Sequence, residues 1–224
     1  MDWELYDEAM AQRRNRLSAI AHLVLDKVEA GGWDTATLLQ EVSKVARARH
    51  ILAWSSHPEQ QAGWRAAGVS GELDGTSMAL SLLSQGGTKV DGWIPVEATL
   101  DRKGTSYSVT VSLVNNTPEG LPSYVAGPST HDDPNRGVPE GAYAGIITLN
   151  VPGVATSLSI DGVDRPLTEG RDGPSRVIAT RVKLMRGEKR TLTFRFTLPE
   201  RQPIVVEPSA RPDPIHWRYG DHEW

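Results

Sequence analysis

The spacing of the apolar residues changes near residue 100, and this change limits the folds open to the chain. Up to about Gly68 the apolar residues recur at helical spacing, whereas from about Thr105 to Val206 they mostly alternate with polar residues. A period of 3.6 marks amphipathic helices, and a period of 2 marks strands that bury one face. Helices followed by strands, without interleaving, predict an α+β protein in which an N-terminal helical hairpin and a short helix pack on an antiparallel β-sandwich.

Residues 1–72 are predicted to form the helical segment. A helix over residues 3–29 carries an apolar stripe and stops at Gly31-Gly32, since glycine commonly follows a helix end. Asp34 or Thr35 can cap a second helix that runs to about Arg49, and the short link predicts an antiparallel helical hairpin. A third, short helix follows Ser56 and ends near Gly68. The stripe of the first helix consists of Tyr6, Met10, Leu17, Ile20, Ala21, Val24 and Val28.

Residues 73–207 are predicted to form the sandwich, of immunoglobulin-like or jelly-roll-like type with about eight strands. The alternation is clearest over residues 106–114 and 190–198, where Ser and Thr separate the apolar positions. Within the helical segment, residues 50–54 are short and apolar and are predicted to be a strand or a buried extended segment. Residues 117–142 have no period and are predicted to be a loop, and residues 208–224 form an extended, Pro-rich tail. The predicted strands are 77–84, 92–100, 106–114, 143–150, 155–160, 175–185, 190–198 and 203–207.

Composition excludes several classes of function. A chain of 224 residues with 38% hydrophobic and 23% charged residues is typical of a folded domain. The net charge of −4 argues against nucleic-acid binding, because phosphate contacts need a basic face. The absence of cysteine excludes disulfides and thiolate metal sites. No apolar run is long enough to span a bilayer and the first residues do not resemble a signal peptide, so the chain itself predicts no membrane contact.

Few residues suggest chemistry, and no catalytic set, metal site or cofactor is predicted. Arg13, Arg14 and Arg16 lie within one helical turn and can hold a phosphate or pyrophosphate, although a solvated helix face is the alternative. Trp93 and Trp217 are the tryptophans best placed to stack on sugar rings, whereas Trp54 and Trp64 are predicted to fill seams between elements. His131-Asp132-Asp133 with Asn135 offers oxygen ligands but is interpreted as an acidic loop, and the sequon Asn115-Asn116-Thr117 as a chance occurrence.

Three stretches of the chain resemble one protein family. They are residues 49–64 (RHILAWSSHPEQQAGW) followed by 68–71 (GVSG), residues 86–91 (GGTKVD), and residues 116–128 (NTPEGLPSYVAGP). Together they resemble the C-terminal part of actinobacterial proteins grouped as domain of unknown function 4012, and the resemblance covers nearly the whole chain in order.

The resemblance implies a role at the cell surface. Members of the family are anchored by an N-terminal membrane helix, face the outside of the cell and are linked to surface-polysaccharide assembly. We therefore expect this chain to be a non-catalytic extracellular module, structural or in contact with cell-wall or surface polysaccharide, whose missing N-terminal domain is a further partner. A chain complete as given would instead be cytoplasmic. The resemblance also implies a structural ion pair between Lys89 and Asp91 at a hairpin.

Two other functions stay open. The missing N-terminal region of the family is distantly similar to LytR-CpsA-Psr phosphotransferases, which act on polyprenyl-pyrophosphate-linked glycopolymers. In that alternative, Arg13, Arg14 and Arg16 complete a pyrophosphate site of an enzyme. A third function is assembly of identical chains, because exposed sheet edges can pair with other chains, and the sequence leaves the oligomeric state open.

Overall fold

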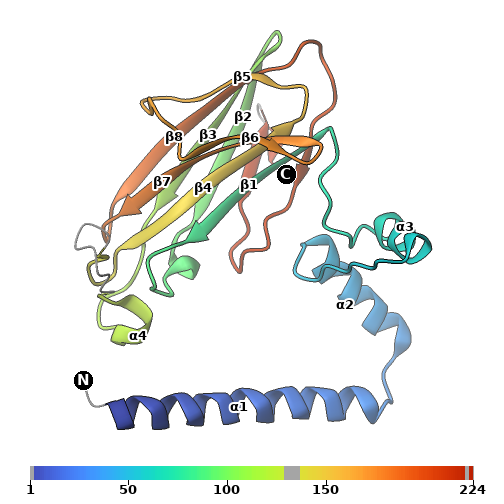
Figure 1. The fold of residues 1–224 in the computed structure, drawn as a ribbon, viewed down its shortest axis with the longest axis vertical. Coiled ribbons are helices and arrows are strands. Elements are labelled where there is room, and N and C mark those ends of the chain that lie inside the picture. Colours follow the sequence, from blue (N-terminus) through green and yellow to red (C-terminus); the bar gives the residue numbers. More distant parts are fainter. Residues whose placement is uncertain (1–2, 129–136, 220–221, 224) are drawn as a thin grey trace. The chain divides into compact units, whose positions relative to one another are not determined.

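A computed structural model describes residues 3–128, 137–219 and 222–223, with side chains for all of these except residues 3–13, 17, 222 and 223. The three longer helices lie at the N-terminal end of the chain and the strands in its C-terminal part, which confirms the predicted α+β class (Figure 1). The chain divides into two compact units, Met1–Lys44 and Val45–Trp224, which are described separately here.

The first unit consists of two helices, α1 (Trp3–Glu29) and the greater part of α2 (Thr35–Arg47). Asp34 precedes α2 and its carboxylate accepts hydrogen bonds from the backbone nitrogen of Thr37, at 2.9 Å, and from the Thr37 hydroxyl. These bonds lower the pKa of Asp34 below its usual value, because they favour the charged carboxylate. Asp34 is therefore the N-terminal cap of α2, one of the two residues that the sequence offered.

The two helices do not bury the apolar faces that a helical hairpin would bury. Every described side chain of α1 is exposed, including Ile20 at 58% and Val24 at 56%. On α2, Leu38 and Val42 are exposed as well, and Ala46 is the buried residue. The helical spacing thus predicted the extent of each helix, but the described side chains do not pair one helix with the other.

The second unit begins with an irregular segment that carries α3 (Pro58–Ala66). Residues 50–54, predicted as extended, form no strand. Arg65 of α3 makes a two-pronged ion pair with Glu72, with nitrogen–oxygen distances of 2.5 and 2.9 Å. The guanidinium of Arg49 lies 3.5 Å from the carboxylate of Glu207 and so joins the start of this unit to its last third.

The rest of this unit is a two-sheet sandwich (Figure 1). Among the described residues, one sheet has the strand order β6-β7-β4-β1-β9 and the other the order β11-β10-β2-β3-β8-β5. A 3-10 turn, η1 (Asp91–Trp93), and a short helix, α4 (Ser123–Ala126), lie in the connections. The strands are β1 (Ser77–Ser84), β2 (Val96–Lys103), β3 (Ser106–Val114), β4 (Tyr143–Pro152), β5 (Thr156–Ile160), β6 (Thr168–Asp172), β7 (Ser175–Leu184), β8 (Lys189–Thr197), β9 (Val205–Glu207), β10 (His216–Tyr219) and β11 (His222–Glu223).

The core lies between the two sheets and is built from the alternating positions. In β3 the side chains of Tyr107, Val109, Val111 and Leu113 are buried, and the residues between them are half-buried or exposed. Alternation places every second side chain on the same face, so one face of β3 enters the core and the other, which carries Ser and Thr, does not. The cluster continues across the interior with residues of β1, β4, β7 and β8, among them Met78, Leu80, Ile147, Leu149, Ile178, Leu184, Phe194 and Phe196.

Two strand pairs differ from the antiparallel pattern expected. β9 pairs parallel with β1, and β10 pairs parallel with β2. Both strands follow β8, so long stretches of chain separate them from their partners, as a parallel pair requires. The Pro-rich tail is therefore not merely extended, because it returns to the second sheet and places β10 beside β2.

Tyr143 is a fully buried side chain whose hydroxyl has no hydrogen-bond partner among the described residues. Burial raises the pKa of this phenol well above its ordinary value; the charge of Asp91 raises it further and that of Arg211 lowers it. The native state therefore holds the phenol neutral at pH values where the unfolded chain ionises. The contribution of this phenol to the free energy of unfolding is therefore fully present below about pH 10, and it decreases as the pH rises above that value.

Replacing Tyr143 by phenylalanine is expected to change the alkaline stability of the protein. The loss of stability above about pH 10, about 1.4 kcal/mol per pH unit from this group, should disappear in Tyr143→Phe, which should also be about 1 kcal/mol more stable at neutral pH. Urea unfolding of both proteins between pH 8 and 11 measures the effect. Parallel pH profiles for the two proteins would contradict the expectation.

Candidate functional site

Trp93 lines an open hollow on the surface of the sandwich. The residue ends η1, is half-buried and packs against the core. The hollow has a volume of about 480 Å³ and is lined by Gly92, Trp93, Pro95, Asn116, Pro212 and Asp213. We call this feature the Trp93 hollow. Its residues come from three distant stretches of the chain, and so no local sequence pattern marks it.

A buried arginine holds the walls of the hollow together. Arg211 is only 7% exposed, and its Nη2 donates hydrogen bonds to the backbone oxygens of Asp91, at 3.0 Å, and Ile94, at 2.8 Å. Its Nε lies 3.4 Å from the backbone oxygen of Asp213. Because guanidinium donors have fixed directions, one side chain links the turn that carries Trp93 to the tail that carries Asp213.

Backbone hydrogen bonds fix the part of the hollow where Asn116 lies beside the turn that carries Trp93. The backbone nitrogen of Asn116 donates a hydrogen bond to the backbone oxygen of Trp93 at 2.9 Å. The backbone nitrogen of Trp93 in turn donates to the backbone oxygen of Val90 at 2.9 Å. The side chain of Asn116 is exposed and that of Asp213 is half-buried. An indole surface with an amide and a carboxylate beside it offers an apolar platform together with donors and acceptors. That combination suits a ligand rich in hydroxyl groups, such as a sugar.

Asn115, next to Asn116 in the chain, is fully buried and serves the fold. Its Nδ2 donates to the backbone oxygens of Gly141, at 2.8 Å, and Leu184, at 3.1 Å. Its Oδ1 accepts from the backbone nitrogen and the hydroxyl of Thr117, at 3.0 and 2.6 Å. The side chain thereby joins the loop after β3 to the chain before β4 and to the end of β7. A side-chain amide used in this way cannot carry a glycan in the folded protein, so the sequon has a structural role.

Trp217 does not belong to the hollow, and its predicted role as a sugar platform is corrected. The residue lies on β10, is only 6% exposed and is part of the core between the sheets. A ring in that position cannot stack on a sugar without leaving the core. The seam positions predicted for Trp54 and Trp64 are not observed either, because these side chains are 77% and 41% exposed.

The ion pair expected between Lys89 and Asp91 is not formed by these two described side chains. The Lys89 ammonium lies 5.2 Å from the centre of the Tyr124 ring, which is a cation–π contact. The backbone nitrogen of Lys89 donates a hydrogen bond to the backbone oxygen of Val125 at 2.7 Å. Lys89 therefore fastens α4 to the chain that follows β1.

The remaining candidates stay predictions. Arg14 and Arg16 are exposed on α1, and the side chain of Arg13 lies outside the described residues. A phosphate-binding role for this cluster therefore rests on its spacing alone. The cluster of His131, Asp132, Asp133 and Asn135 also lies outside the described residues. Within the described part of the chain, no group of three His, Asp or Glu side chains is placed to hold a metal ion.

The chain belongs to the α+β class, with a two-sheet sandwich as its larger part. Comparison with protein-family models, with curated proteins and with solved structures finds no match to it. Of the helices that the structure describes, none has the length and apolar character needed to cross a membrane.

Proposed function

We propose that this chain is a non-catalytic, extracellular module of a cell-envelope protein and that it contacts surface polysaccharide through the Trp93 hollow. The observation that carries the proposal is that half-buried Trp93 lines the hollow together with Asn116, which is exposed, and Asp213, which is half-buried. Sugar rings present apolar faces that pack on an indole, and their hydroxyl groups pair with amide and carboxylate groups at the edge of the ring.

The rigidity of the hollow supports the same proposal. Arg211 and two backbone hydrogen bonds hold its walls, so a polymer that binds there does not have to order them. Affinity gains from such preorganisation, because binding then costs less conformational entropy. The wide, open shape of the hollow suits a chain that passes across the surface better than a small molecule that must be enclosed.

Removing the indole is expected to weaken polysaccharide binding. Retention of the protein by isolated cell-wall polysaccharide, or on a glycan array, should fall by about two- to tenfold in Trp93→Ala, since a stacking contact contributes roughly 0.5–1.5 kcal/mol and about 1.4 kcal/mol corresponds to tenfold. Trp54→Ala is the matched control, because Trp54 is 77% exposed and does not line the hollow.

A second variant separates binding from folding. Asn116→Ala removes an exposed amide from the hollow and leaves its backbone bond to Trp93 in place, so it should reduce retention without lowering the thermal midpoint. Equal retention of the parent protein, Trp93→Ala and Asn116→Ala would refute the Trp93 hollow as the binding site. If no envelope polymer retains the parent protein, a purely structural role is favoured.

A further inference from the structure

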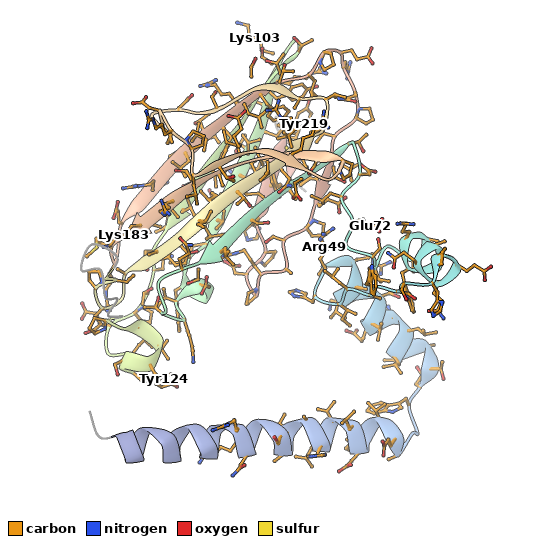
Figure 2. All side chains as sticks on the ribbon, viewed as in Figure 1. Arg49, Glu72, Lys103, Tyr124, Lys183 and Tyr219 are labelled. Atoms are coloured by element: carbon orange, nitrogen blue, oxygen red, sulfur yellow. The ribbon has the colours of Figure 1, made fainter. Side chains whose placement is uncertain are left out.

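A second cavity lies at one end of the sandwich, apart from the Trp93 hollow. It has a volume of about 420 Å³, within the range of small-molecule sites. Leu100, Tyr107, Ile204, Val206 and Tyr219 form apolar walls from β2, β3, β9, β10 and the segment before β9. Figure 2 shows Lys103, which ends β2, at the end of the sandwich opposite to Tyr124 and Lys183. Among the described residues, none lines both sites.

The strand register places an arginine where a core residue would be expected. Along β2, Val96, Ala98 and Leu100 are buried, and Arg102 continues the same face. Arg102 is half-buried and lines the cavity, whereas its neighbours Asp101 and Lys103 are exposed and do not. Because side chains alternate along a strand, the position of Arg102 follows from the pleat.

This arginine has no partner in the described structure. Neither the guanidinium of Arg102 nor that of Arg201, the second basic residue of the lining, has a hydrogen bond or an ion pair among the described residues. Of the side chains that the structure describes, no Asp or Glu lines the cavity. A guanidinium with no acceptor among the described residues keeps its donors available to an acceptor on a ligand. The cavity thus combines apolar walls with two unpaired positive charges.

Gln202, which also lines the cavity, adds an unused donor. Its Nε2 is buried and has no hydrogen-bond partner among the described residues. Buried donors are nearly always paired, and an exception calls for an explanation. An acceptor group on a bound molecule would provide one.

We propose that this cavity binds a small organic anion, an apolar chain or ring that ends in a carboxylate. The apolar part packs against Leu100, Ile204 and the two tyrosine rings. The carboxylate accepts hydrogen bonds from the guanidinium of Arg102, with which it can form a two-pronged pair, and Arg201 adds a second positive charge. This proposal does not depend on the proposed polysaccharide site, and each of the two can be refuted without the other.

Calorimetric titration of the full chain with octanoate tests the site. Octan-1-ol supplies the same apolar chain without the charge, and acetate supplies the charge without the chain. Octanoate should bind at least tenfold more tightly than either. In Arg102→Gln the affinity for octanoate should fall at least tenfold, because a charge-assisted pair is lost.

Lys103→Gln provides the matched control. It removes the same charge from the next residue of β2, on the face that points away from the cavity, and should leave the octanoate affinity unchanged. Arg201→Gln, on an exposed side chain, should also weaken octanoate and repeats the test if Arg102→Gln fails to fold. The proposal is overturned if the parent protein does not bind octanoate, if octan-1-ol binds equally well, or if folded Arg102→Gln, or Arg201→Gln in its place, keeps the parent affinity.

Discussion

Replacing Asn115 by alanine is expected to lower the free energy of unfolding by about 3–5 kcal/mol, a large part of the stability of an ordinary domain. The substitution removes the donor that pairs with the backbone oxygens of Gly141 and Leu184, and the acceptor that pairs with Thr117. These partners lie in a region that water does not reach, since Asn115 is 0% exposed. Each group left unpaired there costs roughly 1–3 kcal/mol, so the effect exceeds that of losing the bonds alone.

Equilibrium unfolding in urea measures this effect, and the neighbouring residue provides the control. Asn116 has the same side chain but is exposed, so Asn116→Ala should change the free energy of unfolding by less than about 0.5 kcal/mol. Asn115→Asp preserves the shape and the acceptor but has no donor for the two backbone oxygens, so it should also be strongly destabilised. A loss below about 1 kcal/mol in Asn115→Ala would show that water or a local shift replaces the missing bonds.

The helices and most strands could be predicted because their apolar residues recur with the spacing of a helix or of a strand. The apolar alternation in β3 and β8 gave these strands to within one residue at each end, and α1 was predicted with its observed bounds. β6, with the sequence TEGRD, has no apolar alternation and is held by backbone bonds to β7. β10 has four residues in a Pro-rich stretch and exists because β2 lies beside it. Strands that are held mainly by backbone bonds to a neighbouring strand need no apolar alternation, so their own sequence does not predict them.

The same reasoning explains which site residues were predicted. Composition drew attention to Trp93, but Asn116, Asp213 and Arg211 reach it from other parts of the chain through the return of the tail to β2. The register that places Arg102 on a core-facing position depends on knowing that β2 continues to Lys103, whereas the predicted strand ended at residue 100. Asn115 looked like half of a sequon, and only its burial shows that it ties the loops together.

Trp217 was predicted to be a sugar platform but lies in the core, and Trp217→Ala is therefore expected to cost about 3–5 kcal/mol of stability. The Trp217 side chain is 6% exposed, so its truncation leaves a cavity between the two sheets. The backbone of Trp217 is paired with Ala98 of β2, and this pairing keeps the strand from moving inward to fill the cavity. Trp54→Ala, at a position 77% exposed, should change the free energy of unfolding by less than about 0.5 kcal/mol and controls for the loss of an indole as such.

Trp217→Phe then distinguishes lost packing from a lost ligand contact. Phenylalanine fills most of the same space, so this variant should recover at least half of the stability lost in Trp217→Ala, and it should keep full polysaccharide retention under conditions where it is folded. A platform role predicts the opposite order, with little loss of stability in Trp217→Ala but a clear loss of retention in both variants. Urea unfolding and retention measured on the same preparations decide between them, because a ring buried between two sheets can affect binding only through the fold that it supports.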